Sequence, residues 1–130
     1  MSEAKKATPM SAAVTASCHC GAVSMVLASA PTEVVECNCS LCRRYGVLWT
    51  YYDVGDIQGL PAPEATDSYA WNGRHVDFYR CGTCGCITHW APRASGRKNY
   101  GINARLLPVD VIAAARLRHK DGADTGNYLD

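Results

Sequence analysis

Three cysteines fall within six residues in the stretch Cys37-Asn38-Cys39-Ser40-Leu41-Cys42, and Arg43 and Arg44 follow directly. Zn²⁺ prefers thiolate ligands in a tetrahedron, and short intervals between cysteines let one backbone turn present several sulfurs to one ion. Three thiolates are also the ligand count of a catalytic zinc site, whose fourth position is left for water or substrate. We therefore expect an open zinc site here, with Arg43 as a further catalytic residue that lowers thiol pKa values and binds a carboxylate.

Two further pairs of cysteines lie elsewhere in the chain, in Cys18-His19-Cys20-Gly21 and in Cys81-Gly82-Thr83-Cys84-Gly85. Side chains two apart on an extended segment point the same way, so the first pair can reach one ion. The second pair has the spacing of a zinc knuckle, with glycine where the backbone turns tightly. Neither pair completes a tetrahedron alone. We expect one structural zinc bound by all four thiolates, Cys18, Cys20, Cys81 and Cys84, and hence two zinc ions per chain.

Cys86 is the eighth cysteine and belongs to neither predicted site. It can act as a fourth ligand of the second zinc, which would close the open position, or remain a buried thiol. Free cysteine is commonly buried as a small hydrophobic residue, so we favour the buried thiol. Eight cysteines also permit four disulfides, but Cys-x-Cys neighbours are poorly placed to bridge each other.

The length and charge of the chain restrict its class. With 130 residues it has the usual size of one domain, and we expect a disordered tail over 1–11 and a single zinc-binding domain over 12–130. Thirteen Lys and Arg balance twelve Asp and Glu, so nothing in the net charge favours nucleic acid or an anionic membrane. A zinc ribbon that binds nucleic acid through the basic loop from Arg93 to Lys98 is therefore disfavoured.

The sequence shows no apolar run of about twenty residues and no apolar stretch behind its opening Met1-Ser2-Glu3-Ala4-Lys5-Lys6. We expect a cytoplasmic protein, because clustered cysteines in a reducing compartment usually hold metal.

Alternating apolar residues predict a fold that is mainly β, with antiparallel sheets and one or two short helical turns. A first hairpin is expected around Cys20-Gly21, and a second around Asn72-Gly73, which favours a type I′ turn. Prolines make 55–67 a loop. The predicted strands cover 14–18, 23–28, 33–37, 47–54, 68–71, 75–80, 87–90 and 100–106.

Helix is expected in two places, in one turn capped by Ser40 and in a short segment from Pro108 to Ala115. His75 and His89 lie in predicted strands, where a structural role is commoner than a functional one. The aromatic residues are expected mainly in the core and on the sheet surface, although some of them can line a pocket beside the second zinc. This set comprises Trp49, Tyr51, Tyr52, Trp71, Tyr79 and Trp90.

Taken in order, the cysteine clusters resemble those of the glutathione-dependent formaldehyde-activating family of small zinc proteins. The resemblance runs from about Ala16 to Gly122. The matching pieces are Cys18-His19-Cys20-Gly21-Ala22-Val23, Cys37-Asn38-Cys39-Ser40, Cys42-Arg43, Gly46, Phe78, Cys81, Cys84-Gly85, Trp90, Gly101-Ile102-Asn103 and Arg105.

The resemblance implies a tent-like arrangement of β-sheets around the metal. It also implies a structural zinc at Cys18, Cys20, Cys81 and Cys84 and a catalytic zinc at Cys37, Cys39 and Cys42. The activity named for the family is S-(hydroxymethyl)glutathione synthase, a carbon–sulfur lyase in which the glutathione thiol adds to formaldehyde. We expect an enzyme that acts on thiol adducts of formaldehyde or another small electrophile, with glutathione the expected thiol.

A second hypothesis from another functional class is a zinc-binding module without catalysis. In that case both zinc ions are structural, and the surface of the domain binds another protein. The sequence does not indicate the oligomeric state of either form.

Overall fold

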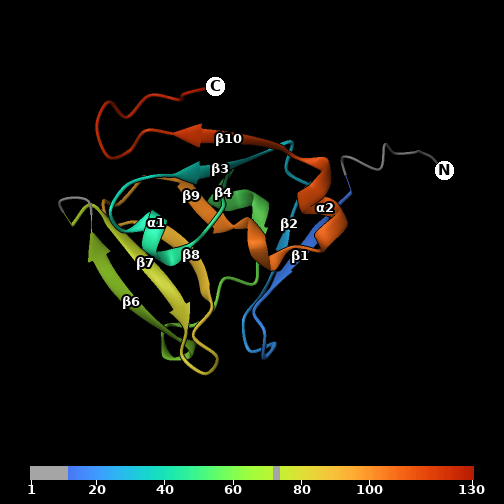
Figure 1. Ribbon diagram of the computed structural model, residues 1–130. Helices are drawn as coiled ribbons and strands as arrows, with labels where there is room; N and C mark the ends of the chain where they lie inside the picture. Colours follow the sequence, from blue (N-terminus) through green and yellow to red (C-terminus); the bar gives the residue numbers. More distant parts are fainter. Residues whose placement is uncertain (1–11, 72–73) are drawn as a thin grey trace.

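Two β-sheets and two short helices make up the computed structural model, which describes residues 12–71 and 74–130 (Figure 1). The prediction of a mainly β fold with one or two helical turns is confirmed. The predicted disordered tail over 1–11 and the predicted type I′ turn at Asn72-Gly73 lie outside the described residues.

The smaller sheet is antiparallel and contains the predicted first hairpin. Its strand order is β1-β2-β5, with β1 at Val14–Ser17, β2 at Ser24–Leu27 and β5 at Ile57–Gln58. The alternation along the hairpin puts Ala16, Met25 and Leu27 in the core with no exposed surface. The predicted loop over 55–67 is wrong at two places. Ile57 is buried and its segment pairs with β2 despite the prolines that follow, and strand β6 (Thr66–Trp71) includes the last two residues of the predicted loop.

The larger sheet has the strand order β10-β3-β4-β9-β8-β7-β6. Its strands are β3 (Glu33–Cys37), β4 (Trp49–Asp53), β6 (Thr66–Trp71), β7 (Val76–Cys81), β8 (Ile87–Pro92), β9 (Asn99–Asn103) and β10 (Arg116–Lys120). The sequence predicts all of these except β10. This strand lies at the sheet edge and pairs with β3 in parallel, whereas the other neighbours in this sheet pair antiparallel.

The helices are short. They are α1 (Cys42–Tyr45) and α2 (Val109–Ala114), and single 3₁₀ turns occupy Val54–Asp56, Pro63–Ala65 and Ala104–Leu106. The predicted capping role of Ser40 is wrong, since the N-cap position belongs to Leu41 and no side-chain oxygen caps the helix. The Sγ of Cys39 accepts a hydrogen bond from the backbone N–H of Cys42 at 3.3 Å instead. The same thiol can thus order the first turn of α1 and ligate a metal.

Two clusters of buried side chains hold the sheets together. The larger one joins Met25 and Leu27 of the small sheet to Ile102 of β9 and to Cys18 and Cys81. The other packs Trp49 and Phe78 beside Cys42. Each predicted metal site therefore adjoins its own part of the core. Neither helix among the described residues is long and apolar enough to cross a membrane.

Candidate metal centres and the adjoining cavity

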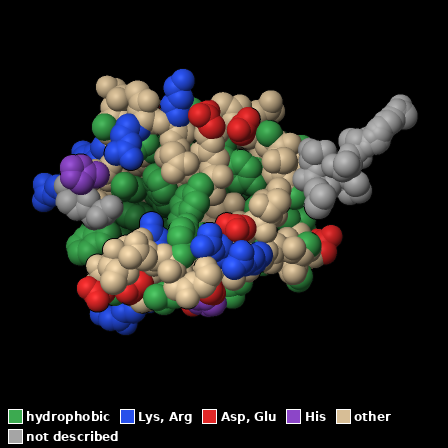
Figure 2. Space-filling view, turned by 90° about the horizontal axis from the view of Figure 1, so that it is seen from above, with side chains coloured by type: hydrophobic (Ala, Val, Ile, Leu, Met, Phe, Trp, Pro, Cys, Tyr) green, Lys and Arg blue, Asp and Glu red, His purple; other side chains and the backbone are tan. Residues whose placement is uncertain are grey.

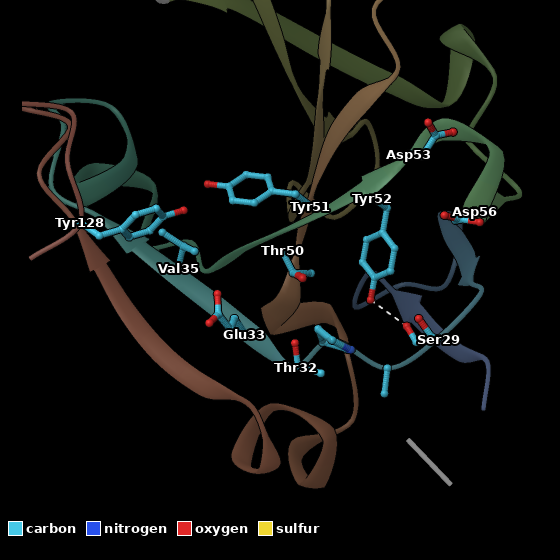
Figure 3. A pocket seen from close by; sticks show the side chains of 12 residues that line it. Ser29, Thr32, Glu33, Val35, Thr50, Tyr51, Tyr52, Asp53, Asp56 and Tyr128 are labelled. Carbon is cyan, nitrogen blue, oxygen red and sulfur yellow. Dashed lines mark hydrogen bonds between the residues drawn. The ribbon is translucent and has the colours of Figure 1, made fainter. Parts of the chain in front are cut away.

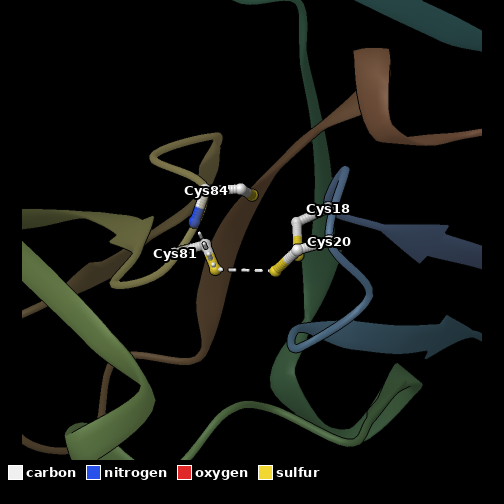
Figure 4. A group of neighbouring side chains, drawn as sticks. All are labelled: Cys18, Cys20, Cys81 and Cys84. Atoms are coloured by element: carbon white, nitrogen blue, oxygen red, sulfur yellow. Dashed lines mark hydrogen bonds between the residues drawn. The ribbon is translucent and has the colours of Figure 1, made fainter.

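Four cysteines from two distant turns converge on one point, as predicted (Figure 4). Cys18 and Cys20 lie between β1 and β2, and Cys81 and Cys84 lie between β7 and β8. Their sulfurs are all within 4.8 Å of one another, with 3.7 Å between Cys18 and Cys20 and 3.6 Å between Cys20 and Cys81. A zinc tetrahedron with Zn–S bonds of about 2.3 Å has S···S edges of about 3.8 Å. The donor set therefore fits zinc, and we call it the first cluster.

Backbone N–H groups of the two turns point at these sulfurs. The N–H of Val23 donates to the Sγ of Cys18 at 3.3 Å, and the N–H of Thr83 donates to the Sγ of Cys81 at 3.4 Å. Gly85 has φ 80°, so the predicted tight turn after the second ligand of the knuckle is confirmed. A hydrogen bond from the N–H of Cys86 is the largest contribution that lowers the pKa of Cys84, to about 5. The turn after β7 thus stabilises the thiolates of Cys81 and Cys84, and the thiolate is the form that binds metal.

Cys86 lies beside the first cluster, where its thiol hydrogen-bonds that of Cys84. It is half-buried against the larger core cluster and belongs to neither metal-ligating group. The alternative that it closes the second site therefore finds no support. All eight cysteines are free thiols, so the disulfide alternative finds none either.

Cys37, Cys39 and Cys42 form the second cluster, with their sulfurs within 4.8 Å of one another. They come from the end of β3, the following turn and the first residue of α1. The indole Nε1 of Trp49 donates to the Sγ of Cys42 at 3.3 Å. The described residues supply three cysteine ligands here, which fits a tetrahedral zinc with one position left for another molecule.

The thiols of the second cluster compete for protons. A hydrogen bond from the thiol of Cys42 is the main cause that lowers the pKa of Cys37, to about 5, and the same bond raises the pKa of Cys42. The opposite directions of these two shifts reflect the repulsion that two neighbouring thiolates would have without a metal. A divalent cation removes this repulsion and accepts both thiolates, as a metal site requires.

The segment that follows β10 covers the second cluster, which the sequence did not predict. A Cβ on Gly122 would lie 2.5 Å from the Sγ of Cys37, and the backbone N–H of Gly122 donates to that sulfur. Asn38 fixes the segment, because its side chain donates to Asp121 Oδ1 at 3.0 Å and accepts from the N–H of Ala123 at 2.9 Å. Gly122 was the one feature of the sequence that could have indicated this close approach of the backbone to Cys37.

Arg43 and Arg44 are exposed on α1, and neither lines the cavity beside the second cluster. The expectation that Arg43 serves the site finds no support in this geometry, because α1 turns its side chain away once Cys42 has entered the core. Arg97, from the loop before β9, and Lys120, from the end of β10, line the cavity instead. Their approach depends on tertiary structure, so spacing alone could not reveal it.

A cavity of about 1070 Å³ opens beside the second cluster and includes its three cysteines in its lining. Trp49, Tyr51, Trp71 and Trp90 line it, so these aromatic residues of the sequence do border a pocket. Tyr52 and Tyr79 do not line it. Figure 2 shows hydrophobic side chains gathered in a hollow across one face of the molecule, with Lys and Arg side chains around them.

A smaller hollow of about 390 Å³ lies next to this cavity (Figure 3). Tyr51 and Tyr128 line both spaces and separate them. The smaller hollow contains no cysteine, and the Tyr52 hydroxyl across it donates to the backbone carbonyl of Ser29 at 2.8 Å. Its carboxylates, Glu33, Asp53 and Asp56, distinguish it from the larger cavity.

The two strand histidines differ. His89 is buried in β8, where its Nδ1 and the Thr88 hydroxyl form a hydrogen bond of 2.9 Å and its ring stacks on Tyr79. Burial lowers the pKa of His89 to about 4. A structural role for it agrees with this setting. His75 precedes β7, is exposed and lines the cavity, so its predicted place in a strand is wrong.

Comparison with known proteins bears out the resemblance. The family model described as glutathione-dependent formaldehyde-activating enzyme matches residues 13–115, which include all eight cysteines and leave β10 and the segment over the second cluster outside the match. A crystal structure of a Rhodobacter sphaeroides protein, a structural genomics target, is 28% identical, with a TM-score of 0.63. That similarity covers 79% of this chain and 98% of the other. The chain therefore belongs to the family of glutathione-dependent formaldehyde-activating enzymes.

Proposed function

We propose that the protein is a zinc-dependent enzyme of the carbon–sulfur lyase class that acts on thiol adducts of formaldehyde or another small electrophile, with glutathione as the thiol. The observation that carries this proposal is the position of the second cluster. Three cysteines share one metal-sized space, and all three line a cavity large enough for a ligand. The first cluster has four cysteines, which complete a tetrahedron by themselves, and this supports a structural role for a zinc bound there.

Zinc in the second cluster would supply a Lewis acid that lowers the pKa of a thiol or polarises a carbonyl oxygen. The chain's own residues prepare the site for this chemistry. The Trp49 indole and the N–H of Cys42 hydrogen-bond the sulfurs of Cys42 and Cys39 and fix their direction. Arg97 and Lys120 provide the positive charge that binds the carboxylates of a peptide thiol.

The proposed reaction adds the thiol across the carbonyl bond of an aldehyde. A carbon–sulfur bond forms, the carbonyl π bond breaks, and the thiol proton ends on the oxygen. The reverse reaction releases thiol and aldehyde, and neither direction needs an oxidant or a reductant. Aromatic side chains line much of the cavity in which this exchange would take place.

Cobalt substitution with a glutathione titration tests the proposal. We expect two metal ions per chain, and the thiolate-to-metal absorption of one of them shifts when glutathione binds. S-methylglutathione, which lacks a free thiol, is the matched ligand control and leaves the band unchanged. Four sulfurs at both sites and no exchangeable ligand would contradict the proposal and favour the interaction module with two structural zinc ions.

Two variants refine the same experiment. Cys39→Ser removes the shifting band, because it takes one of three ligands from the second cluster. Cys86→Ser is the matched control, since Cys86 belongs to neither group, and it keeps both bands. We also propose a cytoplasmic location, where the eight free thiols remain reduced and available to metal.

A further inference from the structure

Six aromatic side chains surround the cavity of the second cluster, far more than a one-carbon aldehyde needs. They come from three parts of the fold: β4, the strands β6 to β8, and the segment after β10. The six residues are Trp49, Tyr51, Trp71, Phe78, Trp90 and Tyr128.

The inner part of this wall is fixed by packing. The rings of Tyr51 and Trp90 lie tilted against each other with 6.0 Å between their centroids. A Cβ on Gly101 would lie 1.9 Å from the Nε1 of Trp90, so the indole lies directly on the backbone of β9. An aromatic surface held in this way binds a flat ligand at a low cost in conformational entropy.

The outer part of the wall is accessible. Trp71 and Tyr128 are each 40% exposed and still line the cavity. The Arg118 guanidinium lies 3.9 Å from the centre of the Tyr128 ring and holds it in place. A ligand can therefore enter between two aromatic edges before it reaches the sulfurs.

The Lys and Arg side chains in the lining of the cavity, Arg97 and Lys120, have no acidic side chains beside them there among the described residues. These two cations and the aromatic wall suit a ligand that has both an anionic group and a flat apolar part. The volume of the cavity, about 1070 Å³, lies just above the usual range of ligand pockets, which is about 300–1,000 Å³.

We propose that the electrophile of this enzyme is an aromatic aldehyde, whose ring in the thiol adduct packs between Trp71, Trp90 and Tyr128. This inference rests on the proposed function, because it assigns a substrate class to the same site. The chemistry is unchanged: the carbon–sulfur bond forms at the aldehyde carbon, and the thiol proton ends on the aldehyde oxygen. Formaldehyde has no group that would fill the aromatic part of the cavity.

Calorimetry with unreactive thioethers tests the inference on the zinc-loaded protein. We expect S-benzylglutathione to bind at least about tenfold more tightly than S-methylglutathione, because the ring gains aromatic contacts. S-(cyclohexylmethyl)glutathione has the same size without the aromatic ring and should bind several-fold more weakly than the benzyl compound. Equal binding of the benzyl and methyl compounds, or of the benzyl and cyclohexylmethyl compounds, overturns the inference, as does a failure of the benzyl compound to bind.

Two variants locate the binding. Trp71→Ala should reduce the benzyl-to-methyl ratio to about threefold or less, whereas Tyr69→Ala should leave the ratio unchanged. Tyr69 is the matched control, since it lies on the same strand, is 48% exposed and does not line the cavity. Tyr128→Ala provides a second test of the outer wall. A ratio that survives both Trp71→Ala and Tyr128→Ala overturns the inference.

The two proposals fail in different ways. A thioether cannot react and has no thiol for the metal, so its affinity reports on the cavity alone. The cobalt band shift reports on thiol binding at the second cluster. A shift with glutathione combined with equal affinities for the benzyl and methyl compounds leaves the proposed function intact and removes the aromatic substrate.

Discussion

Gly122 is the residue through which the C-terminal part of the chain reaches the second cluster. Its missing side chain lets the backbone approach Cys37, and its N–H hydrogen-bonds the sulfur of that residue. Any Cβ here must displace Cys37 or Cys39, whose Cβ would lie 3.3 Å away.

The variant Gly122→Ala should therefore weaken the second metal site and leave the first intact. We expect the metal content to fall from about two ions per chain toward one, with at least about a tenfold loss of affinity at the second site. Metal analysis after dialysis against a weak chelator measures this. Gly55→Ala is the control, because its Cβ meets a side-chain oxygen of Asp53 at 3.2 Å and no cysteine. Retention of both ions by Gly122→Ala would contradict the assigned contact.

For single residues, the sequence predicted the cysteines that lie together, but not the other residues that surround them. Spacing identifies Cys18-x-Cys20 and Cys81-x-x-Cys84 because each pair is presented by one local turn. The proximity of Gly122 to Cys37 and the exposure of Arg43 depend on how distant segments pack, and no local pattern encodes them.

Among the elements, β10 is the one that the sequence did not reveal. The segment Arg116–Lys120 has a single apolar residue among basic ones, so it lacks the alternation that identified the other strands. Charged contacts with β3 take the place of the missing apolar ones. A guanidinium nitrogen of Arg118 lies 3.5 Å from a carboxylate oxygen of Glu33, and the Nε2 of His119 lies 3.5 Å from a carboxylate oxygen of Glu36. Such charges are usual on an edge strand, where they also discourage pairing with other chains.

The chain end returns to β10 through Asp130. Its carboxylate accepts from the His119 backbone N–H at 2.8 Å and contacts the ring Nδ1 at 2.7 Å. The hydrogen bond between the imidazole and the Asp130 carboxylate is the main cause that raises the pKa of His119 above 6.5. The hydrogen bond from the His119 backbone N–H is the main cause that lowers the pKa of Asp130 below 3.8. Glu36 and Arg116 also act on this pair.

The pH dependence of this contact follows from the two directions. The raised pKa of His119 stabilises the folded state fully below pH 6.5 and loses its effect as the pH rises through the folded value. The lowered pKa of Asp130 acts above pH 3.8 and is lost as the pH falls through its folded value. Asp130→Asn should therefore lower the Tm most between pH 3.8 and 6.5 and progressively less at alkaline pH. A Tm difference that does not change with pH would contradict this.

Within the whole molecule, the first cluster joins the small sheet to the large one. Its four ligands come from the β1–β2 and β7–β8 turns, which belong to different sheets. The second cluster instead takes all its ligands from one segment, Cys37 to Cys42, and borders a cavity. Metal ions bound at the two clusters should therefore contribute unequally to folding.

Single serine substitutions separate these contributions. Cys81→Ser should destabilise the protein by about 4 kcal/mol or more, or prevent folding, because loss of a structural metal is among the largest effects of a point mutation. Cys39→Ser should keep the fold and lose one metal ion. Thermal unfolding with metal analysis measures both, and Cys86→Ser provides the control. Equal loss of folding in Cys39→Ser and Cys81→Ser would favour two structural zinc ions.

The sequence was sufficient to predict a mainly β fold, but not every feature of how its parts are arranged. Alternation predicted the strands of the first hairpin, because Ala16, Met25 and Leu27 share one buried face. The strands β6 and β7 were predicted from the turn residues between them instead. The convergence of the first hairpin and the middle of the chain on one four-cysteine group followed from pairing two incomplete ligand sets. The cavity did not follow, because its lining comes from seven segments far apart in the chain.

The separation of the first cluster's ligands also affects how the chain reaches its folded state. Cys20 and Cys81 are 61 positions apart, yet each belongs to a two-thiol turn that forms locally. An ion bound by one turn gains its other two ligands only when the second turn reaches it, and this closes a long loop of chain between the two turns. At a large excess of zinc, each turn binds its own ion, and one of the two must dissociate before the sheets can meet. Refolding should therefore be fastest near stoichiometric zinc and slower on either side of it, which stopped-flow tryptophan fluorescence can follow.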